Sequence, residues 1–293
     1  MNYELGVIQK VEAQGGGAYG RPLLIETETG KYILRRSAIR TSKATIAYER
    51  SLIEHLRKHN LPAARIIKTR KREDFVRIDG EYYIVYEYIE GVRPGRGAIT
   101  GAKLKSAARV LASYHEAVKG FTPEGRNIQK SNIPVVDIDN LGALRSRIEQ
   151  AKRELEGRRP QTYTRSQILF LRHYDLIIEQ IDRLERNLPR ARYERLPKRI
   201  VYGDYNPYNT RFVGDELVGM FDWDYARDEA RIFDIANEMI LVYTECRLRL
   251  KEIGEFIEEY QEASDEPLTR EELEALPEMF RMKLLELVLL RTC

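Results

Sequence analysis

The stretch Ile200–Asp224 reads IVYGDYNPYNTRFVGDELVGMFDWD, and it decides what the rest of the chain can be. The apolar runs at 199–202 and 217–221, with a shorter one at 210–213, are typical of strands separated by polar loops. The last two runs flank the turn Gly214–Glu216, which predicts a hairpin that folds the chain back on itself. We therefore expect Asp222 to return beside Asn209.

Three oxygen-bearing side chains then meet at strand ends, namely Asp204, Asn209 and Asp222. Mg²⁺ prefers such hard oxygen ligands and is commonly held by one or two carboxylates together with substrate phosphates. A remaining carboxylate can accept a proton from an attacking hydroxyl. Each residue type is also an ordinary loop former. The joint spacing, D-x4-N with a second Asp thirteen residues further on, is that of the kinase catalytic and metal-binding loops.

This segment resembles the aminoglycoside phosphotransferase/choline kinase family, whose catalytic loop reads H-G-D-x-x-x-x-N before an I-D-[WF]-[DE] motif. The matching residues are Tyr202-Gly203-Asp204, Asn209 and Phe221–Asp224, and Phe233–Ala236 matches a D-[LI]-A helix start that follows in the family. Tyr202 stands where the family has His, which makes the chain a divergent member.

The resemblance implies a role for each matching residue. Asp204 would be the catalytic base, Asn209 and Asp222 would hold Mg²⁺, and Asp234 would brace the catalytic loop from a neighbouring helix. Asp224 would touch metal or substrate, or would be a solvated loop acid.

The first ninety residues predict strands around one helix. Leu5–Gln14, Arg21–Thr27 and Lys31–Arg36 are strand-like, and Asp79-Gly80 suits a type I′ hairpin turn. Lys43–Asn60 has apolar residues near helical spacing. This order of elements matches the nucleotide-binding lobe that the resemblance implies.

Within that lobe, the resemblance implies nucleotide-binding positions. The glycine-rich loop at 15–20 would offer backbone N–H groups to phosphates through Gly15, Gly16 and Gly17, although a plain hairpin loop explains the same glycines. Arg35 would replace the family's phosphate-binding Lys, and Glu49, with Glu54 as the alternative, would pair with it. The backbone around Glu87 and Ile89 would bind adenine.

The remainder is mainly helical. Helices are expected over Thr100–Val118, Leu141–Glu156, Ser166–Asn187 and from Phe233 onward, with a capping box at Thr269–Glu272. His115 is expected to pack and form hydrogen bonds. The expected fold is α+β, a two-lobed protein-kinase-like fold with a small antiparallel sheet at 1–90 and a mainly helical catalytic lobe at 91–293. The hinge would lie at about 87–95.

The amino-acid composition excludes several classes of protein. The chain has 293 residues, with 49 Lys and Arg against 46 Asp and Glu. Dense but balanced charge excludes a disordered tail and a strongly basic nucleic-acid binder. Two cysteines cannot form a disulfide framework, and the N-terminus lacks a signal-peptide pattern. The apolar runs are too short to span a membrane. We expect a cytoplasmic protein without a nucleic-acid or membrane partner.

The leading interpretation is an ATP- and Mg²⁺-dependent kinase that phosphorylates a hydroxyl of a small molecule of the aminoglycoside, amino alcohol, homoserine or sugar type. Two alternatives stay open. A pseudokinase or binding protein would agree with Tyr202 and Arg35. A divergent protein kinase is disfavoured because Gly203 precedes Asp204 where those enzymes place Arg, and because D-F-G and A-P-E motifs are missing from the sequence.

Overall fold

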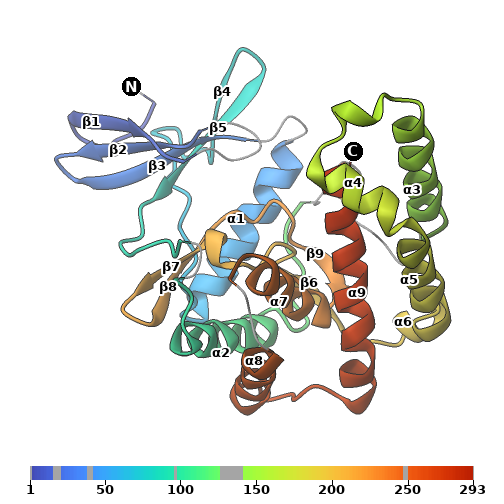
Figure 1. Cartoon of the computed structure of the whole chain (residues 1–293). Helices are drawn as coiled ribbons and strands as arrows, with labels where there is room; N and C mark the ends of the chain where they lie inside the picture. Colours follow the sequence, from blue (N-terminus) through green and yellow to red (C-terminus); the bar gives the residue numbers. More distant parts are fainter. Residues whose placement is uncertain are drawn as a thin grey trace.

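A five-stranded antiparallel sheet occupies one end of the molecule (Figure 1). The computed structural model describes residues 2–15, 21–37, 42–95, 98–125, 141–246 and 250–292. The sheet has the order β1-β2-β3-β5-β4 and consists of β1 (Ile8–Ala13), β2 (Leu23–Thr27), β3 (Gly30–Arg36), β4 (Val76–Ile78) and β5 (Glu81–Glu87). All its pairings are antiparallel, as the sequence predicts.

The turn between β4 and β5 has the predicted conformation. Asp79 and Gly80 both have positive φ values, 51° and 85°. A type I′ turn needs this left-handed backbone at its two central residues, and its twist matches that of the paired strands. The Asp-Gly pair thus sets the register that places Val76 opposite Tyr83.

Helix α1 (Lys43–Lys58) packs beneath the sheet (Figure 1). The hydroxyl of Ser42 accepts a hydrogen bond from the Thr45 backbone N–H, which caps the helix start. Its apolar residues recur at helical spacing and are buried; they are Ile46, Leu52, Ile53 and Leu56. Glu49 lies on the same buried face, and this places a carboxyl group inside the core.

The rest of the described chain is mainly helical. The helices are α2 (Gly101–Ala117), α3 (Leu141–Glu156), α4 (Arg165–Arg172), α5 (Tyr174–Asn187), α6 (Arg190–Tyr193), α7 (Ile232–Cys246), α8 (Leu250–Ala263) and α9 (Arg270–Thr292). The capping box of α9 is confirmed, since Thr269 and Glu272 exchange side chain–backbone hydrogen bonds of 2.9 and 3.2 Å. Within these described helices, none combines the length and the apolar character that crossing a bilayer requires.

The expectation of one continuous helix over Ser166–Asn187 is wrong. The structure divides it at His173, which ends α4 and begins α5 with φ −111° and ψ 18°. His173 donates its N–H to Leu169 and Phe170, and its carbonyl accepts from Ile177. Neither Gly nor Pro stands at this break, so the local sequence gives no sign of it.

Two small ribbons interrupt the helical part. Strands β7 (Thr210–Val213) and β8 (Glu216–Met220) form the predicted hairpin, and β6 (Lys198–Val201) pairs with β9 (Arg227–Ala230). Sequence patterning misses β9 because Arg-Asp-Glu-Ala has no apolar alternation. Its partner β6 holds it through backbone pairing, with Ile200 opposite Asp228.

The β7–β8 hairpin is bound along both edges by segments that precede residue 95. Val92 exchanges two backbone hydrogen bonds with Phe212, of 2.8 and 3.0 Å. On the other edge, Met220 donates to Pro62 and accepts from Ala64, at 2.8 and 3.2 Å. We refer to these two backbone attachments as the hairpin joint. The division of the chain at 90/91, with a hinge over 87–95, stays a prediction.

Candidate active site

The loop after β6 presents Asp204. Gly203 precedes it with φ 81°, and a Cβ at this position would lie 2.1 Å from the Tyr225 carbonyl oxygen, so only glycine fits. The Asp204 carboxylate accepts hydrogen bonds from the side-chain amides of Asn206 and Asn209, at 2.9 and 2.7 Å. Burial, and then the nearby charge of Asp222, raise the pKa of Asp204 to about 7.

The hairpin brings Asp222 back to Asn209, as the sequence predicts. The Phe221 backbone N–H donates to the Asn209 carbonyl at 3.1 Å, so Asp222 directly follows the point where the two loops join. Asp222 itself has φ 77°, a left-handed conformation that is uncommon outside glycine. Such strained backbone is frequent at functional sites.

Oxygen atoms suited to a cation are available at this junction. Asp222 Oδ1 is buried and accepts no hydrogen bond of normal geometry, although Arg35 Nη2 lies 3.0 Å away. The side-chain nitrogen of Asn209 is used on Asp204, so its amide oxygen is the atom that a cation would bind. In the described ranges, no three His, Cys, Asp or Glu side chains cluster as a metal site. One carboxylate and one amide fit Mg²⁺ that also binds phosphates.

Asp234 braces the catalytic loop from the start of α7, and this prediction is confirmed. Its two carboxylate oxygens accept the backbone N–H groups of Tyr202 and Gly203, at 2.7 and 2.8 Å. His115 lies 3.2 Å from the same carboxylate and 2.8 Å from the Tyr260 hydroxyl. His115 is 1% exposed, which confirms the expected packing role.

Tyr202 links the two loops, and this explains how the chain tolerates the departure from His. The ring is fully buried, and its hydroxyl donates to the Phe221 carbonyl in the segment that leads to Asp222. The ring also lies 4.6 Å from Trp223, centroid to centroid. Tyr202 therefore supports the loop geometry through one hydrogen bond and aromatic packing.

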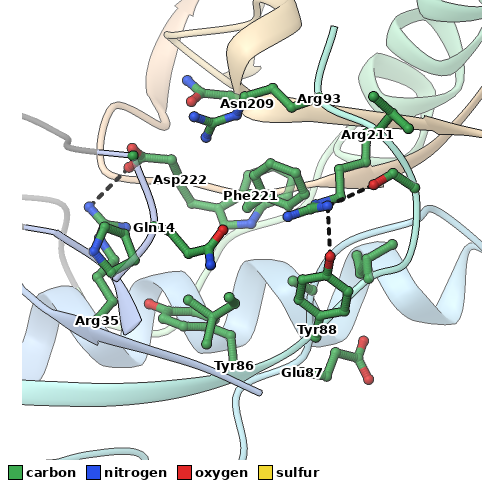
Figure 2. A pocket seen from close by; sticks show the side chains of 18 residues that line it. Gln14, Arg35, Tyr86, Glu87, Tyr88, Arg93, Asn209, Arg211, Phe221 and Asp222 are labelled. Atoms are coloured by element: carbon green, nitrogen blue, oxygen red, sulfur yellow. Dashed lines mark hydrogen bonds and ion pairs between the residues drawn. The ribbon is translucent and has the colours of Figure 1, made fainter. Parts of the chain in front are cut away.

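A cavity of about 570 Å³ lies between the sheet and this junction (Figure 2). Six of the predicted site residues line it: Gly15, Arg35, Glu87, Ile89, Asn209 and Asp222. Gly16 and Gly17 lie outside the described residues. Asp204 and Glu49 are not among the lining residues; Asp204 contacts the cavity wall through Asn209, and Glu49 through Tyr86.

The expected ion pair between Arg35 and Glu49 is wrong for this structure. Arg35 forms ion pairs with Asp222 and Asp224, which follow strand β8 in the chain. Glu49 instead accepts a hydrogen bond of 2.9 Å from the Tyr86 hydroxyl. Burial and the charge of Asp224 raise the pKa of Glu49 to about 7, against the opposing effect of Arg35.

We expect Glu49→Gln to change how stability depends on pH. In the wild type, the folded-state pKa of Glu49 exceeds its unfolded value, so stability falls as pH rises from about 4.5 to about 7. The variant has no such titration. On going from about pH 5 to about pH 8, its free energy of unfolding should therefore rise relative to that of the wild type by on the order of 1–3 kcal/mol. Thermal or urea unfolding at the two pH values measures this difference. Glu54→Gln, on the exposed face of α1, is the control, and an equal change in both variants would contradict the assignment.

Sequence reasoning missed two arginines of the cavity. Arg211 donates to the Tyr88 hydroxyl at 3.1 Å and to the Gly91 carbonyl at 2.7 Å, and its guanidinium lies over the Tyr88 ring (Figure 2). Arg93 also lines the cavity. The only signal in the sequence is position, since Arg211 follows Asn209 by two residues and Arg93 lies within the predicted hinge.

The sheet, the two loops and the cavity are arranged as in the protein-kinase-like fold. The family model of the phosphotransferase enzyme family matches residues 10–276, so the chain belongs to that family. Homoserine kinase of Beijerinckia indica is 25% identical over 235 residues, which cover 80% of this chain and 65% of that protein. The chain thus spans less than two thirds of the length of this curated relative.

Solved structures share the fold at low sequence identity. An aminoglycoside phosphotransferase from Alicyclobacillus acidocaldarius superposes with a TM-score of 0.71 at 18% identity, over 97% of this chain and 82% of that one. An amicoumacin kinase, solved with AMP-PNP, Ca²⁺ and Ami, gives 0.70 at 15% identity over 98% and 83%. The expected α+β, kinase-like fold is confirmed.

Proposed function

We propose that the chain transfers the γ-phosphoryl group of ATP to a hydroxyl group of a small molecule. The observation that carries this proposal is the junction of the catalytic loop with the segment that leads to Asp222. There Asp204, Asn209 and Asp222 meet beside a cavity of nucleotide size. Nucleotide-bound structures among the neighbours in fold, including the AMP-PNP complex of the amicoumacin kinase, support ATP as the donor.

In the proposed arrangement, the adenine would lie against the backbone of Glu87 and Ile89. The Glu87 side chain is turned away toward α1, where it pairs with Arg57 and accepts the Arg65 backbone N–H at 3.0 Å. Only the backbone of Glu87 would therefore face the base. Gly15 and the following glycines would approach the phosphates, and Arg35 would contribute a forked cation.

Asn209 and Asp222 would hold Mg²⁺, which when bound offsets the negative charge of the phosphates. Asp204 would orient the acceptor hydroxyl and take its proton as the new P–O bond forms. The side-chain amides of Asn206 and Asn209 hold this carboxylate in one orientation. The base is therefore positioned before the acceptor hydroxyl binds. The pKa of Asp204, raised to about 7, suits a group that both accepts and releases a proton near neutrality.

The acceptor is proposed as a class, a small hydroxylated molecule. The homoserine kinases among the relatives favour an amino-acid alcohol, whereas the structural neighbours include kinases of aminoglycosides and of aminopropanol. A pseudokinase is disfavoured because Asp204, Asn209 and Asp222 all remain and two of them line the cavity. A protein kinase is disfavoured because Gly203, which only glycine can occupy, stands at the position of the Arg in those enzymes.

Ligand binding tests the proposal directly. We expect ATP with Mg²⁺ to raise the melting temperature, since a ligand at one hundred times its Kd stabilises a protein by about 2.7 kcal/mol. A screen of homoserine, amino alcohols, sugars and aminoglycosides for phosphate transfer would then identify the acceptor. Asp222→Asn should weaken the Mg²⁺ dependence of both signals. Intact folded protein without any response to ATP or GTP would overturn the proposal.

A further inference from the structure

Arg93 is a cation of the cavity that the proposed mechanism does not use. It lines the same cavity as Arg35, Asn209 and Asp222, and Figure 2 shows it at the edge of the pocket where Asn209 lies. Arg35 is at the other side, where it pairs with Asp222. Two guanidinium groups thus flank the junction at which phosphates would bind.

The backbone around Arg93 is held firmly. Val92 forms its two hydrogen bonds with Phe212, three residues after Asn209 in the chain. Arg211 donates to the Gly91 carbonyl at 2.7 Å, and Pro94 is buried directly after Arg93. Val92 and Arg93 both line the cavity, and both side chains are also exposed to solvent. The position of Arg93 relative to Asn209 is therefore set by the fold.

The charge of Arg93 has no acidic partner. Within the described residues, no ion pair or hydrogen bond joins its guanidinium to another side chain, whereas Arg35 has two acids and Arg211 has a hydroxyl and a carbonyl. Burial, and then the adjacent Arg211, lower the pKa of Arg93, and the charge of Asp222 opposes this effect. Two neighbouring cations without an acid between them favour an anion in this part of the cavity.

We propose that Arg93 binds the phosphate chain of the nucleotide from the side opposite Arg35. This inference rests on the proposed function and deepens it. The oxygens of Asn209 and Asp222 would hold the cation that bridges phosphates, so a guanidinium beside them lies within reach of phosphate oxygens. Arginine suits this role because its fork binds phosphate through paired hydrogen bonds. The chain would then bind the phosphates through two arginines, whereas the kinase strand motif that Arg35 matches supplies one lysine.

Affinities for adenosine, AMP, ADP and ATP test the assignment by calorimetry with Mg²⁺ present. In Arg93→Ala, we expect a loss of roughly ten- to hundredfold for ADP and ATP, and little change for adenosine. Arg93→Lys should recover part of the loss, because it keeps the charge without the fork. Arg77→Ala, an exposed arginine of β4, is the matched control and should bind all four ligands as the wild type does.

The outcomes separate the two proposals. If the wild type binds ATP and Arg93→Ala binds it equally well, the role of Arg93 is wrong and the proposed function stands. An equal loss for adenosine and ATP would also overturn it, since it would indicate a change in the backbone of the cavity. A raised KM for the acceptor with unchanged ATP affinity would place Arg93 in acceptor binding instead. A wild type that binds none of the nucleotides would overturn both proposals.

Discussion

Asp204→Asn is expected to lower kcat for phosphoryl transfer by about 10²- to 10⁴-fold, the usual contribution of a general base. The reason is that the amide cannot accept the proton of the acceptor hydroxyl. Nucleotide affinity should change little, because Asp204 is not among the residues that line the cavity. The measurements are kcat with the acceptor that the screen identifies and Kd for ATP by calorimetry.

The control for this variant is Asp215→Asn. Asp215 lies in the turn at the far end of the β7–β8 hairpin, where it accepts hydrogen bonds from Lys103 and Thr100 at 2.9 and 3.1 Å. Its substitution should leave kcat within about twofold of the wild type, as for surface changes generally. Full turnover by Asp204→Asn on the same acceptor would show that the base is another residue.

Asp234→Ala is expected to destabilise the protein by about 3–5 kcal/mol. The variant leaves the buried N–H groups of Tyr202 and Gly203 without acceptors, and it removes the carboxylate that His115 contacts. Unsatisfied buried donors cost roughly 1–3 kcal/mol each. Urea unfolding monitored by circular dichroism measures the loss as a lower midpoint.

The matched comparison for Asp234 is Asp228→Ala, an exposed carboxylate of β9 in the same part of the molecule. Its effect should stay within about 0.5 kcal/mol. A loss in Asp234→Ala no larger than this would mean that the catalytic loop keeps its conformation without the carboxylate. Folded Asp234→Ala protein should also show lower kcat, since the brace orients the loop that carries Asp204.

Much of the site is predictable because its geometry comes from local spacing. Only four residues separate Asp204 from Asn209, and a tight hairpin leads to Asp222, so the chain has few ways to place these groups apart. The type I′ turn at Asp79-Gly80 was predictable for the same reason, since the dipeptide itself prefers the required backbone.

The remainder depends on contacts between distant segments. Arg35 and Asp224 are 189 residues apart, and nothing near Glu49 in the chain indicates that Tyr86 holds it. Strand β9 is a polar segment that pairs with β6, which precedes it by more than twenty residues. Arg93 is positioned by Phe212, whose backbone forms two hydrogen bonds with the neighbouring Val92. Such pairings follow from tertiary packing and not from local pattern.

The hairpin joint has a mechanical consequence. The hairpin carries Asn209 before its first strand and Asp222 after its second, and four backbone hydrogen bonds fasten its edges to segments that also lead to the sheet. Any rotation of the sheet away from the hairpin would have to break all four of these hydrogen bonds at once. The hairpin and the segments that lead to the sheet should therefore move together as one stiff frame around the cavity.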